Sequence, residues 1–144
     1  MRRIYDARFI ENFTKHPDIW PHVTDDDCVP IDQWRPVIAP HVHWLLSDDC
    51  GALFMTYPLQ PRLWEAHSQV LPGFRENTVA YYKAAFAYLK QETICTRLLG
   101  LIPRGNYPAK RAAEAAGMKA AHTLARCCKK RGRLIDMTLY ELEI

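Results

Sequence analysis

The sequence is short of the features that mark membrane proteins and nucleic-acid-binding proteins. Its formal net charge is only +3 over 144 residues, which is too small to indicate nucleic-acid binding by itself. No apolar run approaches the roughly 20 residues of a membrane-spanning helix. The opening segment carries the pair Arg2-Arg3 but no apolar core behind it, unlike a signal peptide. We therefore expect a cytoplasmic protein with no membrane segment.

Motifs for disulfides and metal ions are also scarce. The five cysteines, an odd number, include no C-x-x-C pair, which predicts free thiols in a reducing compartment. His41 and His43 could bind zinc together with His67 if their strands were neighbours, but no fourth ligand is evident. The sequence therefore predicts no metal site.

What the sequence does have is an apolar content of 49% and a length that suits one hydrophobic core. We expect a single domain over residues 1–144. Apolar periodicity and turn residues predict helices at residues 6–15, 77–91 and 106–116, and strands at residues 41–46, 52–57, 63–71, 94–102, 118–128 and 134–142. The proline-rich segment 16–40 is predicted to be irregular, with a short helical turn within residues 31–37.

The order of these elements predicts a mixed sheet. The first three strands follow one another through short turns, as in an antiparallel meander. A strand, the helix 77–91 and the strand 94–102 then form a crossover, which favours parallel pairing. The strand 94–102 is mostly apolar, which predicts burial on both of its faces. The expected fold class is α/β (α+β), with helices packed on the sheet.

The stretch NYPAKRAAEAAGM begins at Asn106 and predicts a short, tightly packed helix. Asn106 suits the N-cap, because its side-chain oxygen can accept a hydrogen bond from an amide of the first turn. Pro108 is tolerated in that turn, and Gly117 suits the left-handed position after the last turn. The small residues that share one face are Ala109, Ala112, Ala113 and Ala116. They predict a close approach of the helix axis to the sheet.

This helix also resembles a motif of the GCN5-related N-acetyltransferase (GNAT) superfamily. In the pattern N-x-x-A followed by G and an apolar residue, the places are held by Asn106, Ala109, Gly117 and Met118. The order of elements is similar over most of the chain. The resemblance implies a mostly antiparallel mixed sheet with helices on both faces. It also implies transfer of an acetyl group from acetyl-coenzyme A, as cosubstrate, to an amine.

The resemblance also assigns residues to the cofactor. The family's V-x-P strand end is similar to the segment 70–72, and its phosphate loop Q/R-x-x-G-x-G/A is similar to the segment 75–80. Arg75 and Ala80 match that pattern, whereas Thr78 stands where glycine is usual and Glu76 adds a negative charge. The residues expected to bind coenzyme A are Val70, Arg75, Asn77, Thr78, Ala80 and Asn106.

Two residues of the strand 63–71 are candidates for catalysis. Glu65 and His67 are two positions apart, so their side chains share one face of a strand. Family members often use a carboxylate here to deprotonate the amine, and histidine also suits work as a general base near neutral pH. The alternative is a packed strand histidine beside a rim carboxylate. The resemblance places Ala113 where many members have a tyrosine that acts as general acid.

A narrower resemblance gives the alternative function. The segments 16–23 and 64–67 are similar to small GNAT-like proteins of tailed bacteriophages and prophages, some of them virion or head-assembly proteins. The alternative is therefore a phage structural or head-assembly protein of this fold with weak or absent acyl transfer. Phage virion proteins and a second copy of the chain, as a homodimer, are then possible partners. The basic tract 129–133 could touch nucleic-acid phosphates, but a solvated hairpin turn is the stronger expectation.

Overall fold

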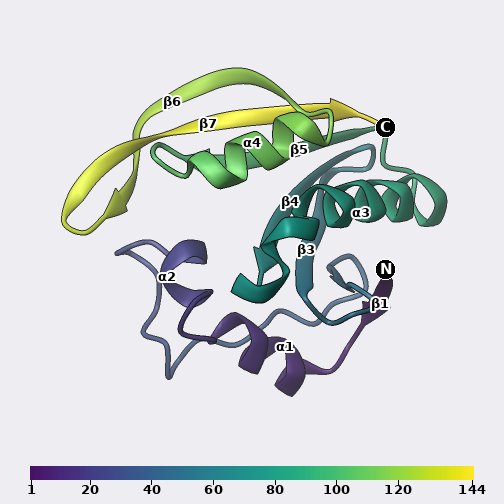
Figure 1. Cartoon of the computed structure of the whole chain (residues 1–144), viewed down its shortest axis with the longest axis horizontal. Coiled ribbons are helices and arrows are strands. Elements are labelled where there is room, and N and C mark those ends of the chain that lie inside the picture. The colour runs from purple at the N-terminus through teal and green to yellow at the C-terminus, as the bar shows by residue number, and fades with distance from the viewer.

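The computed structural model describes residues 1–144 and is built around one seven-stranded sheet (Figure 1). The strands are β1 (Arg2–Ile4), β2 (His43–Leu46), β3 (Ala52–Gln60), β4 (Leu63–Val70), β5 (Arg97–Pro103), β6 (Lys119–Lys130) and β7 (Arg133–Glu143). Their order across the sheet is β1-β2-β3-β4-β5-β7-β6. Only β4 and β5 pair in parallel, as the crossover predicted, and every other pairing is antiparallel. The mixed, mostly antiparallel sheet is confirmed.

Helices cover both faces of this sheet. They are α1 (Ala7–Thr14), α2 (Trp20–Val23), α3 (Thr78–Glu92) and α4 (Tyr107–Ala115), with a 3₁₀ helix, η1 (Pro72–Asn77), directly before α3. One buried cluster joins the sheet to α3 and α4, and a second, smaller cluster joins it to α1. Figure 1 shows α1 and α2 well apart from α3 and α4. None of these helices has the length and apolarity required to cross a bilayer.

The register between β3 and β4 decides which side chains share a face. Tyr57 lies directly opposite Glu65, and Met55 lies opposite His67, so all four side chains lie on the face covered by α1. Ser68 belongs to the other face, where its hydroxyl lies 2.7 Å from that of Tyr82 on α3. The face that carries Glu65 and His67 is therefore separated from α3 and α4 by the sheet itself.

The parallel pair β4–β5 is short and then splays. Pairing begins at Leu63 with Arg97 and ends at Glu65 with Leu99. Beyond that point β4 continues to Val70 and β5 continues to Pro103 without pairing to each other. The two strands therefore part directly after Glu65, which leaves their facing backbone groups unpaired over the second half of each strand.

Three details of the sheet differ from the sequence-based expectation. β5 is not buried on both faces, because buried and half-buried residues alternate along it from Leu98 onward. β1 was not predicted, since three residues give too little periodicity to be detected. β3 does not end at residue 57, as predicted, but continues through Pro58 to Gln60, with an irregular register between these two residues. Pro58 is tolerated there because β2 begins only at His43, opposite Thr56, so Pro58 has no β2 partner that needs an N–H group.

The basic tract 129–133 forms the turn of the β6–β7 hairpin, as predicted. The turn has left-handed residues at Arg131 and Gly132, with φ of 52° and 73°. The Asp26 carboxylate accepts hydrogen bonds from the amides of both residues, at 2.9 Å and 2.6 Å, and the Asp26 amide donates to the carbonyl of Lys129. Figure 1 shows the hairpin arching over to the segment that follows α2. Asp26 therefore fastens the segment after α2 to the hairpin turn through three hydrogen bonds.

Candidate functional site

The helix α4 is capped as the sequence predicted. Asn106 Oδ1 accepts a hydrogen bond from the Ala109 amide at 3.3 Å, and Gly117 has a φ of 102°. Ala112 and Ala113 are buried, so the small face packs into the core that α4 shares with α3. The Asn106 side chain is used for this cap, which gives the residue a structural role whatever else it contacts.

Glu65 and His67 come together with Tyr57 in one polar cluster, which we call the β3–β4 triad. His67 Nε2 lies 3.2 Å from Glu65 Oε1. The Tyr57 hydroxyl donates to Glu65 Oε2 at 2.9 Å and lies 3.4 Å from His67 Nε2. The Tyr57 and His67 rings are nearly parallel, 14° apart, with their centroids separated by 5.9 Å. The side-by-side placement predicted for Glu65 and His67 is confirmed, and Tyr57 is the member that sequence reasoning missed.

The charge states of the triad follow from its contacts. Hydrogen bonding to His67 is the largest cause that lowers the pKa of Glu65, and the Tyr57 hydroxyl adds to it. Burial, followed by the bond to Glu65, raises the pKa of Tyr57 to about 12. Near neutral pH Glu65 is therefore ionised and Tyr57 keeps its proton. The Glu65 side chain is only 13% exposed, whereas that of His67 is 42% exposed, so the imidazole is the more accessible group.

No proton donor stands at the position that many family members fill with tyrosine. Ala113 is fully buried in the core between α4 and the sheet. Tyr107 lies near the start of the same helix, but its side chain is 65% exposed and makes no hydrogen bond within the chain. The described residues therefore offer no evident general acid on α4.

The predicted phosphate loop adopts a 3₁₀ helix instead of an open loop. η1 covers Pro72–Asn77, and α3 continues from it without a break. The Thr78 amide donates to the Arg75 carbonyl, and the Thr78 hydroxyl donates to the same oxygen at 2.6 Å. The Arg75 and Glu76 side chains are exposed beside this turn. The Thr78 amide, which a pyrophosphate in this loop would need, is thus already hydrogen-bonded within the chain.

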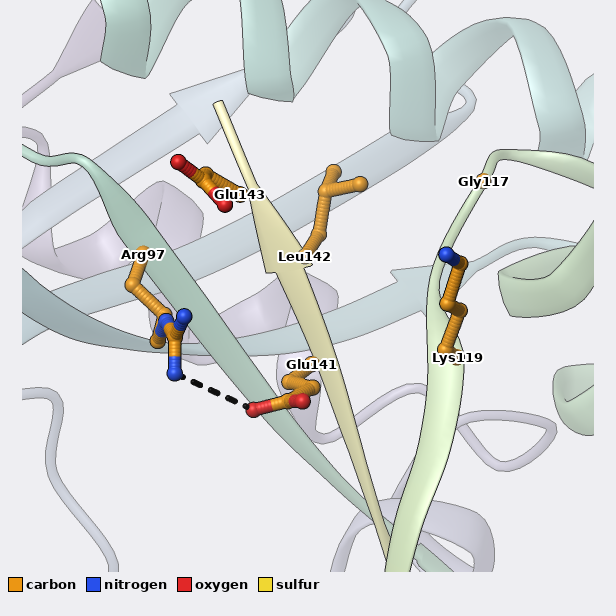
Figure 2. A pocket seen from close by; sticks show the side chains of 6 residues that line it. All are labelled: Arg97, Gly117, Lys119, Glu141, Leu142 and Glu143. Carbon is orange, nitrogen blue, oxygen red and sulfur yellow. Dashed lines mark ion pairs between the residues drawn. The ribbon is translucent and has the colours of Figure 1, made fainter.

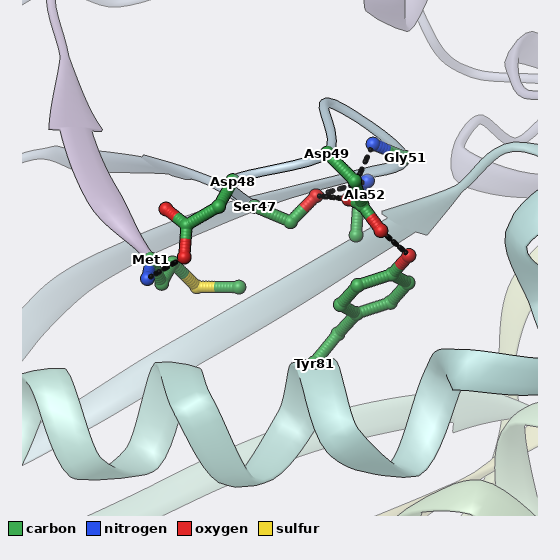
Figure 3. A network of polar contacts seen from close by, with 7 residues as sticks. All are labelled: Met1, Ser47, Asp48, Asp49, Gly51, Ala52 and Tyr81. Carbon is green, nitrogen blue, oxygen red and sulfur yellow. Dashed lines mark hydrogen bonds and ion pairs between the residues drawn. The ribbon is translucent and has the colours of Figure 1, made fainter.

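The turn between β2 and β3 braces this region (Figure 3). The Asp49 carboxylate accepts hydrogen bonds from the hydroxyls of Ser47 and of Tyr81, which lies in the first turns of α3. The Leu71 amide donates to the Gly51 carbonyl at 2.9 Å. A Cβ on Gly51 would lie 2.3 Å from ring carbons of Phe74 in η1. The contact between Gly51 and Phe74 could not be predicted from local sequence patterns, because the two residues are 23 positions apart.

A hollow of about 230 Å³ lies elsewhere, at the end of β7 (Figure 2). Its lining residues are Arg97, Gly117, Lys119, Glu141, Leu142 and Glu143. Arg97 and Glu141 form an ion pair across it, at 3.6 Å. None of the residues predicted for the cofactor or for catalysis lines this hollow.

The histidines considered for zinc lie apart. His43 pairs with Thr56 and His67 pairs with Met55, which are neighbours on β3, so the two side chains point to opposite faces of the sheet. His43 packs edge-on against Trp64, with the ring centroids 5.0 Å apart. Burial, helped by the charge of Arg3, lowers the pKa of His43 to about 4. His43 is therefore a neutral core residue near neutral pH and cannot share a metal ion with His67.

Comparisons with known proteins bear on the fold. No protein-family model matches the sequence, and no curated protein matches it either. Among solved structures, the chain is similar to spermidine N-acetyltransferase from Vibrio cholerae in complex with CoA and spermine, with a TM-score of 0.77 and 14% identity over 99% of this chain and 93% of that one. It is also similar to a GCN5-related N-acetyltransferase from Kribbella flavida, with a TM-score of 0.72 and 13% identity over 99% and 96%.

A third similar structure is ribosomal-protein-alanine N-acetyltransferase from Brucella melitensis, with a TM-score of 0.63 and 15% identity over 72% of this chain and 69% of that one. At such identities the likeness concerns the fold alone, and the resemblance to phage proteins stays a prediction. The chain has the fold of the GCN5-related N-acetyltransferases.

Proposed function

We propose that the chain is an acyl-CoA-dependent N-acetyltransferase, which transfers the acetyl group of acetyl-coenzyme A to an amine of a small molecule or a protein. The position of the Glu65–His67 pair supports this function best. The pair begins at the last residue of β4 that is bonded to β5, directly before the two strands part. A thioester held between the parted strands would bring its carbonyl carbon close to an amine bound at this pair.

The cofactor is expected to use the unpaired backbone of β4 beyond Glu65, as far as Val70. Its phosphates would lie near Arg75 and the start of α3, with Asn77, Thr78 and Ala80 around them. Helix N-termini favour anions through their free N–H groups and partial positive charge, although the Thr78 amide at the start of α3 is already bonded to the Arg75 carbonyl. Asn106 would act indirectly, by capping α4.

The reaction requires one proton transfer and one exchange of bonds. The Glu65–His67 pair takes a proton from the amine, the nitrogen bonds to the acetyl carbon, and the C–S bond breaks. Coenzyme A leaves as a thiolate, which takes a proton from water because α4 offers no evident acid. Positioning of the two substrates, and backbone N–H groups that polarise the carbonyl, would supply most of the rate enhancement.

Binding of acetyl-coenzyme A to the purified protein, measured by isothermal titration calorimetry at moderate salt, tests this function. We expect micromolar affinity, and about tenfold weaker binding for Arg75→Ala, since a hydrogen bond to a charged group contributes about 1.5–3 kcal/mol. Arg8→Ala is the matched control, because Arg8 is an exposed arginine on α1. Unchanged affinity for Arg75→Ala would remove Arg75 from the site, and absent binding at millimolar cofactor would contradict the enzyme proposal.

The closed turn at Thr78 favours a second candidate. A structural or head-assembly protein of this fold, with weak or absent acyl transfer, would have no need for free amides before α3, and Thr78 and Glu76 both oppose a bound pyrophosphate. Thr78→Gly separates the candidates. Improved coenzyme A affinity over a parent that binds poorly would favour the structural role. A parent that already binds tightly would contradict it.

A further inference from the structure

We infer that Nδ1 of His67 is the atom that accepts the proton, and that Tyr57 and Glu65 are positioning residues that hold His67 in the required tautomer. This assignment rests on the proposed function for its chemical role. The hydrogen-bond geometry from which it is argued belongs to the chain itself and can be measured without any substrate.

The direction of the hydrogen bonds follows from counting protons. Tyr57 has one hydroxyl proton, and it donates this proton to Glu65 Oε2 at 2.9 Å. An ionised carboxylate can only accept, so the second oxygen of Glu65 also needs a donor. The atom that faces it is His67 Nε2, at 3.2 Å. Nε2 therefore carries the proton of the neutral imidazole, because a lone pair there would face a carboxylate oxygen.

Tyr57 holds the orientation of the His67 ring as well as its tautomer. It lies directly opposite Glu65 in the β3–β4 register, and His67 is the next residue of β4 on the same face. The phenol stacks on the imidazole at 14°, and its oxygen lies 3.4 Å from Nε2. The Tyr57 proton is already committed to Glu65, so its oxygen can only accept from Nε2–H. Both neighbours of Nε2 thus favour the same tautomer.

The remaining nitrogen is the one available to a substrate. His67 Nδ1 makes no hydrogen bond within the chain, and the His67 side chain is 42% exposed. Both Glu65 oxygens are engaged and their side chain is largely enclosed, so an arriving amine meets the imidazole first. As the amine nitrogen bonds to the acetyl carbon and the C–S bond breaks, its proton passes to Nδ1. The imidazolium formed is then stabilised by Glu65 through Nε2–H.

Nitrogen-15 NMR of the histidine side chains, on the full chain without cofactor, tests this assignment. At about two pH units above the usual histidine pKa of 6.5, long-range proton–nitrogen correlations report which ring nitrogen carries the proton. We expect His67 to be predominantly the Nε2–H tautomer. Glu65→Gln should convert it to the Nδ1–H tautomer, because the new amide can donate to Nε2. Tyr57→Phe should keep Nε2–H as the main tautomer but raise the share of Nδ1–H, because one of the two groups that favour Nε2–H is lost.

Tyr107→Phe is the matched control, because this exposed tyrosine makes no hydrogen bond within the chain and should leave His67 unchanged. An Nδ1–H tautomer in the parent would overturn the assignment of the base. A His67 spectrum unchanged by Tyr57→Phe would overturn the role of Tyr57. The NMR result does not depend on catalysis, so a chain with the expected tautomer but no acetyl transfer would contradict the proposed function and leave the positioning roles intact.

Discussion

The β3–β4 triad and the β4–α3 segment, residues 71–80, differ in how their polar groups are used. In the triad, Tyr57 hydrogen-bonds to both of the other side chains, Glu65 and His67 form an ion-pair contact, and one imidazole nitrogen is left open. In the segment 71–80, backbone groups bond within the chain, as when the Thr78 amide and hydroxyl both donate to the Arg75 carbonyl. The first region therefore keeps one polar atom accessible, whereas polar groups of the second are satisfied within the chain.

The difference has a physical origin. Alternation along a strand brings every second side chain to one face, so the triad needs only the β3–β4 register. The segment 71–80 takes its shape from the β2–β3 turn, through the bond from Leu71 to Gly51 and the contact of Phe74 with Gly51. Local periodicity therefore builds the Glu65–His67 pair, and a tertiary contact shapes the segment proposed to bind the phosphates.

The largest effect is expected from the triad. His67→Gln should lower kcat/KM for acetyl transfer by about 10²–10⁴-fold, because it removes the proton acceptor. His122→Gln is the matched control, since His122 is exposed on the edge strand β6. Steady-state kinetics at saturating acetyl-coenzyme A measures the difference. Equal activity of both variants would return His67 to the role of a packed strand histidine.

The next effect concerns the turn that braces the β4–α3 segment. Gly51→Ala should lower the free energy of unfolding by about 1–3 kcal/mol, because the added Cβ would overlap the Phe74 ring. Gly73→Ala in the same region places its Cβ in open space and should change little. Urea unfolding measures both variants. A Gly51→Ala protein as stable as the parent would mean that η1 can move away freely and that the turn does not set its shape.

A third prediction concerns His43, which lies on the opposite face of the sheet from His67, and the pH dependence of stability. Burial lowers the pKa of His43 to about 4, below the 6.5 of an ordinary histidine. Between these values the unfolded chain binds a proton that the folded chain excludes, so this group makes stability fall as the pH drops from about 6.5 to about 4. His43→Phe, which keeps an aromatic ring against Trp64, should flatten that part of the stability profile.

Melting midpoints across this pH range, compared between His43→Phe and the parent, provide the measurement. His41→Gln is the control, because His41 is exposed just before β2. Parallel profiles of parent and His43→Phe would show that His43 titrates alike in the folded and unfolded chains.

The smallest effect is expected at the cap of α4. Asn106→Ala should destabilise the fold by about 1 kcal/mol, because the Ala109 amide loses its partner. Asn106→Asp keeps an acceptor oxygen and should lose less. Thermal or urea unfolding distinguishes the two. If coenzyme A affinity also falls in Asn106→Ala but not in Asn106→Asp, then the cap links the stability of α4 to the cofactor side.

Much of the fold could be predicted from local pattern. The helix from Asp6, the strands around Leu45 and Phe54, and the capped helix from Asn106 all appear where periodicity and capping residues indicated. β1 escaped prediction because its three residues depend on pairing with β2. The end of β3 was predicted too early because the tolerance of Pro58 depends on where β2 begins. Such errors arise wherever a neighbouring strand, and not the local sequence, decides the outcome.

The sequence by itself determined the mixed sheet, the cap at Asn106 and the common face of Glu65 and His67, because these follow from periods of two and 3.6 residues and from short-range hydrogen bonds. Only the tertiary structure decided that Tyr57 completes the triad, that His43 faces away from His67 and that Asp26 holds the hairpin turn. Each of these depends on strand register or on a contact between residues far apart in the sequence, and local sequence patterns predict neither strand register nor such contacts.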